Sequence, residues 1–81
     1  MQINVKLFAI LRDRAGTSDI ALELPRGSAT SVALESIATQ LPSIKDLLPR
    51  AAVAINREYV SRDTTLNDGD ELALIPPVSG G

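Results

Sequence analysis

The stretch QINVKLFAIL (residues 2–11) decides the fold class, because its side chains alternate in polarity. Ile3, Val5 and Leu7 fall on one face and polar residues fall on the other, a pattern typical of a β-strand with one buried face. The stretch DIALEL (residues 19–24) alternates in the same way. The polar connector RDRAGTS between them predicts a hairpin whose loop is longer than the tight two-residue type.

A change of period after residues 25–27 (Pro-Arg-Gly) predicts one amphipathic helix. The apolar residues at spacing i, i+3, i+4 and i+7 are Leu34, Ile37, Ala38 and Leu41. This spacing forms one stripe along a helix. Thr30 or Ser31 is expected to cap the start of the helix, and Pro42 is expected to end it. The stripe would then pack across the inner face of a small sheet.

The second half of the chain predicts further strands. SIKDLLPR (residues 43–50) is expected to form a short helical turn or an irregular connection. AAVAIN then reads as a strand, and a short strand segment is expected around Val60. LNDGDELALIPP (residues 66–77) holds a glycine-containing turn and the last strand, with Leu72 and Leu74 inward. The order predicts an α+β domain over residues 1–75, a mixed sheet with one main helix packed on one face.

Composition removes several kinds of chemistry. The 81 residues include no cysteine and no histidine, so disulfides, thiol nucleophiles, zinc sites and imidazole catalysis are not expected. A net charge of −2 argues against nucleic acid as the partner. No apolar run approaches the roughly 20 residues of a membrane span, which leads us to expect a cytoplasmic protein. The acidic cluster around NDGD fails the calcium-loop spacing and is interpreted as a turn, so no metal is expected.

Three apolar residues break the alternation. Phe8, Tyr59 and Ile75 are predicted to point away from the helix, and they include the single Phe and the single Tyr of the chain. A cluster of them would form a protein-binding patch with aromatic anchors, whereas a β-bulge would return any one to the core. Arg12, in the first connector, could pair with a carboxylate on a partner or simply be solvated.

The chain ends with an extended tail, PPVSGG (residues 76–81). Its residues are Pro76, Pro77, Val78, Ser79, Gly80 and Gly81. The prolines end the last strand and stiffen the exit, and the glycines are the slimmest residues available. Extended, the tail reaches about 20 Å at ~3.3–3.6 Å per residue, enough to present its carboxylate inside a narrow tunnel of another protein. The alternative interpretation is an ordinary frayed terminus.

Three stretches together carry a family resemblance. They are LFAILRDRAG (residues 7–16), VAINREYV (residues 53–60) and LNDGDELALIPPVSGG (residues 66–81). With them the chain resembles the ubiquitin-like (β-grasp) sulfur carriers, most closely the small subunits of molybdopterin synthase. The resemblance implies that an E1-like adenylyltransferase uses ATP to activate the terminal carboxylate, which then becomes a thiocarboxylate. On the large synthase subunit the thiocarboxylate donates sulfur to cyclic pyranopterin monophosphate, in a heterotetramer. No cofactor is expected on the carrier itself.

The resemblance also implies roles for particular residues. Gly81 would bear the sulfur and Gly80 would lie beside it in the partner's channel. The positions of Phe8, Tyr59 and Ile75 match the apolar positions that face the partner in this family. Arg12 matches a basic docking position at the end of the first strand.

Three other functions fit parts of the same pattern. A thiamine-thiazole sulfur carrier shares the Gly-Gly end, although that family tends to be shorter and usually lacks the paired prolines. A ubiquitin-like modifier would be attached to lysines of target proteins. A plain binding module would not need the tail at all. One fold hosts many functions, so the fold alone does not choose among them.

Overall fold

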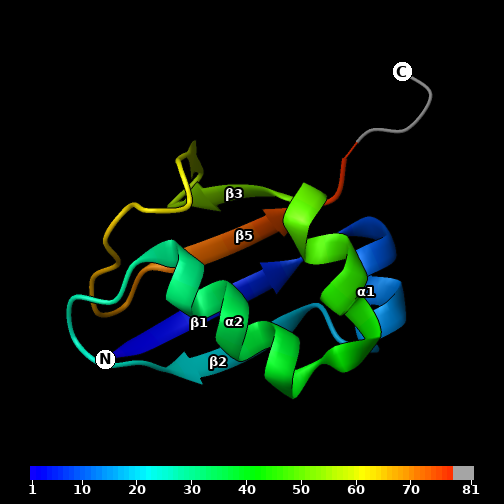
Figure 1. Cartoon of the computed structure of the whole chain (residues 1–81), viewed down its shortest axis with the longest axis horizontal. Coiled ribbons are helices and arrows are strands. Elements are labelled where there is room, and N and C mark those ends of the chain that lie inside the picture. The colour runs from blue at the N-terminus through cyan, green and yellow to red at the C-terminus, as the bar shows by residue number, and fades with distance from the viewer. Residues whose placement is uncertain (78–81) are drawn as a thin grey trace.

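The structure, a computed structural model, describes residues 1–77 and is built on a five-stranded sheet (Figure 1). The strands are β1 (Gln2–Leu7), β2 (Asp19–Glu23), β3 (Ala52–Ile55), β4 (Glu58–Tyr59) and β5 (Glu71–Ile75). Their order across the sheet is β2-β1-β5-β3-β4. The central strands β1 and β5 are parallel, and the other neighbours are antiparallel. The predicted α+β fold with a mixed sheet is therefore confirmed.

Helices cover one face of this sheet and close the core (Figure 1). The main helix is α2 (Thr30–Gln40), followed by the 3-10 helix η1 (Pro42–Arg50). Leu34 and Ile37 of the predicted stripe are buried. They belong to one core cluster with the inward residues of the strands, among them Ile3, Val5, Leu7, Leu22, Leu72 and Leu74. Burying a side chain of this size contributes ~1.5–3 kcal/mol, so this aliphatic layer holds the domain together.

A second α-helix occupies the connector that was predicted to be a hairpin loop. The strand predicted over residues 2–11 is wrong beyond Leu7, because α1 (Ala9–Ala15) begins two residues later. Leu11 is fully buried by this helix. Gly16 ends it in the left-handed region at φ 77°, where its N–H donates to the carbonyl of Arg12 at 2.9 Å. The pairing of β1 with β2 is nevertheless antiparallel, as predicted.

The start of α2 is capped differently from the prediction. Its N-cap residue is Ala29, and no side chain caps it. Instead the N–H of Thr30 donates to the carbonyl of Thr64 at 2.9 Å, and that of Ser31 donates to Arg62 at 2.7 Å. The hydroxyl of Thr30 also donates to Thr64, at 3.0 Å. Backbone carbonyls of residues 62–64 therefore satisfy the N–H groups that a capping side chain would otherwise meet.

The expected short strand, connection and turn are present with small shifts. The short strand lies at Glu58–Tyr59 rather than around Val60, and the connection after α2 is a helix of nine residues. NDGD forms the predicted turn, with Gly69 at φ 85°. No helix within residues 1–77 is long and apolar enough to cross a membrane.

Candidate protein-docking surface

The face of the sheet away from α2 carries a hollow of about 550 Å³, which we call the outer hollow. It is lined by Lys6, Phe8, Ala54, Arg57, Tyr59, Glu71, Ala73 and Ile75. Ala54 and Ala73 are direct partners between β3 and β5 and form its floor. None of the lining residues carries a thiol, an imidazole or an aliphatic hydroxyl, so the outer hollow suits binding rather than nucleophilic catalysis.

The walls of the outer hollow follow from strand register. Lys6 pairs with Ala73, and Tyr59 pairs with Ala54, so these residues form one row across four strands. Side chains at such paired positions project from the same face. Two small side chains in the middle of the row, between two long ones, leave the space empty. A protruding side chain of a partner could occupy it.

The structure brings the three predicted apolar residues to this hollow. Tyr59 is 70% exposed and Phe8 is 45% exposed, while Ile75 is half-buried. Exposed aromatic residues around a pocket are typical anchors of protein interfaces. Arg12 is not among the lining residues. It lies on α1, where its Nε is 3.6 Å from a carboxylate oxygen of Asp13.

The backbone at Phe8 explains its exposure. The strand β1 ends at the buried Leu7, and Phe8 remains extended at φ −123° and ψ 155° before α1 begins. Its carbonyl accepts the N–H of Leu11 at 3.1 Å. Alternation along the strand thus directs Phe8 outward, and the first turn of α1 holds it there.

A tight turn places Arg57 at the edge of the outer hollow. Asn56 and Arg57 are the two residues between β3 and β4, with φ values of 50° and 71°. Two positive φ values identify a type I′ turn, in which glycine is favoured at the second position. The side chain of Asn56 donates to a carboxylate oxygen of Asp70 at 2.9 Å and accepts the N–H of Glu71 at 3.0 Å. These hydrogen bonds therefore hold the turn against the start of β5.

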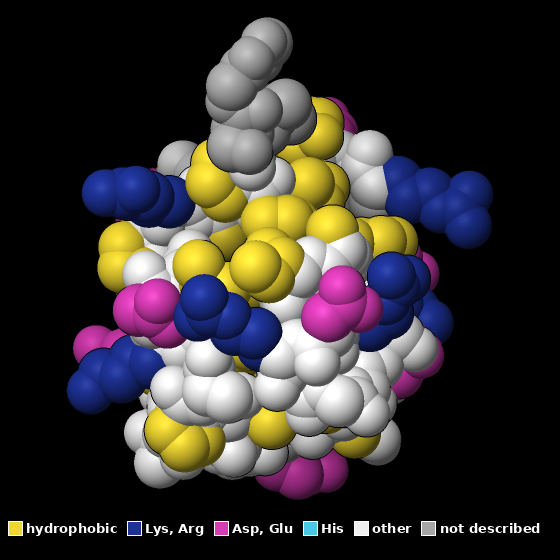
Figure 2. All heavy atoms as spheres, turned by 90° about the vertical axis from the view of Figure 1, so that its right-hand side faces the viewer, with side chains coloured by type: hydrophobic (Ala, Val, Ile, Leu, Met, Phe, Trp, Pro, Cys, Tyr) yellow, Lys and Arg dark blue, Asp and Glu magenta, His cyan; other side chains and the backbone are white. Residues whose placement is uncertain are grey.

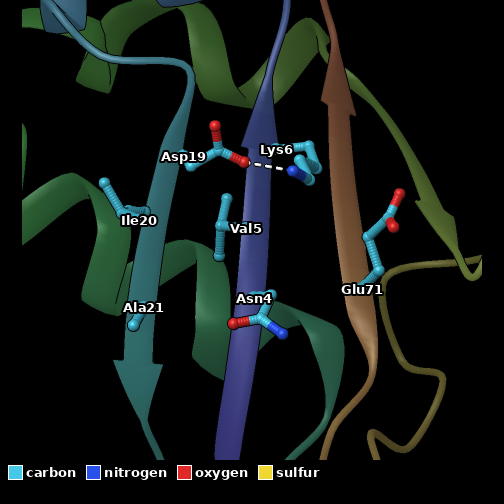
Figure 3. Close-up of a pocket in the computed structure, with 7 residues that line it drawn as sticks. All are labelled: Asn4, Val5, Lys6, Asp19, Ile20, Ala21 and Glu71. Atoms are coloured by element: carbon cyan, nitrogen blue, oxygen red, sulfur yellow. Dashed lines mark hydrogen bonds and ion pairs between the residues drawn. The ribbon is translucent and has the colours of Figure 1, made fainter.

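A second hollow of about 420 Å³ lies beside the first, over β1 and β2 (Figure 3). Across it Lys6 forms an ion pair with Asp19, its cross-strand partner. The hydrogen bond from Lys6 lowers the pKa of Asp19, with help from Ser18, and the same bond raises the pKa of Lys6. Both groups are exposed, so solvent screens the pair, and it contributes little stability and forms no reactive centre.

Hydrophobic side chains also gather at the end of the molecule towards which β1 and β5 point. Figure 2 shows them as a patch with Lys and Arg side chains around it. At this end β5 stops at Ile75, followed by the half-buried Pro76 and the exposed Pro77. The predictions for Val78, Ser79, Gly80 and Gly81 concern residues outside the described part of the chain.

The sequence alone did not single out the floor, Lys6 or Arg57 as parts of this surface. The floor depends on which strands become neighbours, and no local pattern encodes that. The sequence Asn56-Arg57 between two strand segments could have indicated the position of Arg57, because a two-residue connection between strands favours a type I′ turn.

The chain is similar in sequence to known proteins over its whole length. A model of the ThiS family matches residues 5–81. The molybdopterin synthase sulfur carrier subunit of Chlamydomonas reinhardtii is 40% identical over 83 residues, covering 100% of both chains. Its counterpart in Arabidopsis thaliana is 37% identical over 81 residues, covering 100% of this chain and 84% of its own.

Solved structures agree with the architecture. SAMP1 from Haloferax volcanii has a TM-score of 0.92 and 28% identity, covering 100% of both chains. A chain in the complex of subunits 1 and 2 of the molybdopterin-converting factor from Helicobacter pylori has a TM-score of 0.69 and 26% identity, again covering 100% of both. The predicted β-grasp (ubiquitin-like) fold is confirmed by this likeness. With its match to the family over nearly its whole length, the chain belongs to the ThiS family.

Proposed function

We propose that this chain is the sulfur carrier subunit of molybdopterin synthase. The observation that carries the proposal is alignment over 100% of this chain, tail included, with relatives that bear this name. In this proposal the carboxylate of Gly81 is converted to a thiocarboxylate. The isolated chain is a carrier, and it acts in sulfur transfer only with its enzyme partners.

Activation is proposed to occur on an E1-like adenylyltransferase. A carboxylate is a poor electrophile because its oxygen is a poor leaving group. The carboxylate of Gly81 attacks the α-phosphate of ATP, and pyrophosphate leaves. A sulfur nucleophile then attacks the acyl carbon, and AMP departs. ATP is thus consumed at the partner, and the carrier holds no cofactor of its own.

Sulfur delivery is proposed to occur on the large synthase subunit. The outer hollow would dock there through Phe8, Tyr59 and Ile75, with Arg12 reaching a carboxylate beside it. Pro76, Pro77, Val78, Ser79 and Gly80 would then extend through a channel and place the thiocarboxylate of Gly81 against cyclic pyranopterin monophosphate. Two charged carriers would supply the two sulfurs of the dithiolene, in a cytoplasmic heterotetramer.

Docking of this kind is supported by two features. The solved Helicobacter pylori complex contains a similar chain together with a second subunit. In this chain, Tyr59 and Phe8 are the largest exposed apolar side chains of the described residues, and both line the outer hollow. Aromatic side chains of this kind dominate the binding energy of many interfaces.

Intact mass spectrometry tests the proposal directly. The protein is incubated with ATP, sulfide and the adenylyltransferase of the same organism. We expect a mass gain equal to the replacement of one oxygen by sulfur, located on Gly81 by fragmentation. A chain that lacks Gly81 serves as the control and should show no gain. An unchanged mass of the full chain, with an adenylyltransferase that is active on another carrier, would contradict the proposal.

A second candidate is a ubiquitin-like protein modifier. It is favoured by the high structural similarity to SAMP1, a name that stands for small archaeal modifier protein 1. An acyl-adenylate can pass to a thioester and then to an amine, so the same tail would serve. Peptides that carry the C-terminal residues of this chain on a lysine of another protein would establish this activity.

A further inference from the structure

Arg57 occupies a backbone conformation that its own side chain disfavours. Its φ of 71° lies in the left-handed region, at the turn position where glycine is the preferred residue. The side chain is exposed, so it does not contribute to the core. Strained residues of this kind persist where the surrounding structure determines them, and they cluster at functional sites.

The structure holds this turn firmly in place. Asp70 is only 9% exposed, and its carboxylate accepts the side-chain N–H of Asn56 at 2.9 Å and the backbone N–H of Asn67 at 2.8 Å. The backbone N–H of Asn56 donates to the carbonyl of Glu71 at 2.8 Å. The backbone of Arg57 is therefore fixed relative to β5 before any partner binds. Such preorganisation lowers the entropic cost of forming a new contact.

The charge of Arg57 has no ion-pair partner among the described residues. Within residues 1–77, the ion pairs involve Lys6, Arg12 and Arg14, and none involves Arg57. Glu71 lines the same hollow, yet no ion pair joins it to Arg57. The planar guanidinium thus remains available for a carboxylate, which it can bind through two parallel hydrogen bonds.

We infer that Arg57 orients the docked large subunit by binding an Asp or Glu side chain at the edge of the outer hollow. The inference rests on the proposed function. Arg57 follows Asn56, whose N–H bonds to Glu71, the first residue of β5, and both Arg57 and Glu71 line the outer hollow. Ile75 is the last residue of β5, roughly 13 Å from Glu71 at ~3.3 Å per residue. An ionic contact at one end and apolar contacts at the other would fix the direction of the carrier. The chain beyond Ile75 would then face the partner's active site.

The test measures the dissociation constant of the carrier and the large subunit at low and high ionic strength. We expect Arg57→Gly and Arg57→Gln to weaken binding about 10-fold at low salt, with a smaller loss at high salt. Arg57→Lys should recover part of the affinity, since it restores the charge but not the planar fork. Arg26→Gln is the matched control, because Arg26 is exposed and does not line the outer hollow. It should bind like the original chain.

Thermal unfolding of each variant separates binding from folding. Arg57→Gly removes the strained side chain and should unfold at a higher temperature while binding more weakly, a combination that a structural role would not produce. Unchanged affinity of Arg57→Gln at low salt would overturn the inference, even if Arg57→Gly bound weakly, because conformation and not charge would then be responsible. Failure of the original chain to bind the large subunit would instead overturn the proposed function, and this inference with it.

Discussion

Ala54 and Ala73 face each other across β3 and β5, and their small side chains form the floor of the outer hollow. Both are nearly buried by their larger neighbours. The hollow therefore exists because two methyl groups lie between Lys6 on one side and Tyr59 on the other. The register of the strands determines the shape of the hollow. Substitutions at its floor can therefore change this shape without altering the core on the opposite face of the sheet.

Filling the floor should impair docking more than folding. Ala73→Leu places a larger side chain in the outer hollow, where space of about 550 Å³ is available. We expect the melting temperature to stay within a few degrees, while the dissociation constant for the large subunit rises at least 10-fold, about 1.4 kcal/mol. Ala21→Leu is the control, because Ala21 lies on β2 beside the other hollow. Equal affinities of both variants and the original chain would show that the outer hollow stays empty in the complex.

Removing the side chain of Asn56 should destabilise the domain. Asn56→Ala deletes the donor to the buried Asp70 and the acceptor of the Glu71 N–H, and it leaves an alanine at φ 50°. We expect a loss of about 2 kcal/mol in the free energy of unfolding, measured with urea. Asn67→Ala is the matched control, since only the backbone of Asn67 bonds to Asp70 and its side chain is exposed. A loss of the same size in both variants would mean that the Asn56 side chain does not secure the turn.

Much of this fold was predictable because its strongest patterns are local. Alternation identified the faces of β1 and β5, and the spacing of Leu34 and Ile37 identified α2. The same alternation predicted that Tyr59 points outward, and it is 70% exposed. These inferences need only the period of a strand or a helix, which each segment carries by itself.

Other features depend on contacts that no short segment contains. The helix α1 has only seven residues, too few to reveal a helical period, and it follows a strand without a polar break. The start of α2 is bonded by the carbonyls of Thr64 and Arg62, which lie more than thirty residues further along the chain. The outer hollow forms only when four strands pair in the correct register, which aligns Lys6, Ala73, Ala54 and Tyr59. Sequence reasoning therefore found Phe8, Tyr59 and Ile75 at the hollow, but neither its other lining residues nor the hollow itself.

Arg62 should prove important for stability although it is a surface cation. One nitrogen of its guanidinium donates to the carbonyls of Leu48, Pro49 and Ala51 at 2.9, 3.0 and 2.8 Å. These carbonyls lie at and just after the end of η1, where the last acceptors of a helix run out of helical donors, and that of Leu48 also accepts the N–H of Ala51 at 3.2 Å. We expect Arg62→Ala to lower the free energy of unfolding by about 1.5–3 kcal/mol. Arg50→Ala, at an exposed arginine of η1, is the control, and a smaller loss at Arg62 than at Arg50 would refute this account.

Acid should weaken the domain partly through Asp19. The hydrogen bond from Lys6 lowers the pKa of Asp19 below its ordinary value of 3.8. A carboxyl whose pKa is lower in the folded state stabilises the fold above its unfolded pKa, and this contribution is lost as the pH falls through the folded pKa. We expect Asp19→Asn to reduce the pH dependence of urea unfolding below about pH 4. The midpoint near neutral pH should change little because the pair is exposed. If Asp19→Asn left the pH dependence of unfolding unaltered, the Lys6–Asp19 pair would contribute nothing to the stability of the fold.

Asp63 provides an independent comparison in the same pH range. Its pKa is lowered by a hydrogen bond from the hydroxyl of Ser61, at 2.5 Å, rather than by a cation. Raising the ionic strength should therefore diminish the contribution of Asp19 and leave that of Asp63 nearly intact. Urea unfolding of Asp63→Asn and Asp19→Asn at two salt concentrations would measure the difference. Equal responses to salt would contradict the assignment of the Asp19 shift to Lys6.

Gly81→Ala separates docking from sulfur transfer. Under the proposed function, the added methyl group lies beside the acyl carbon, inside a channel that fits a slim chain. Phe8 and Tyr59, which are proposed to dock, belong to the folded domain and are untouched by this change. We expect the dissociation constant for the large subunit to stay within about 3-fold, less than 0.7 kcal/mol, while the rate of sulfur transfer from the thiocarboxylate falls at least 10-fold. Single-turnover transfer from carriers charged beforehand isolates this step from activation. Full transfer by Gly81→Ala would count against a narrow channel, whereas weakened docking with normal transfer would place the terminal glycine in the binding surface instead.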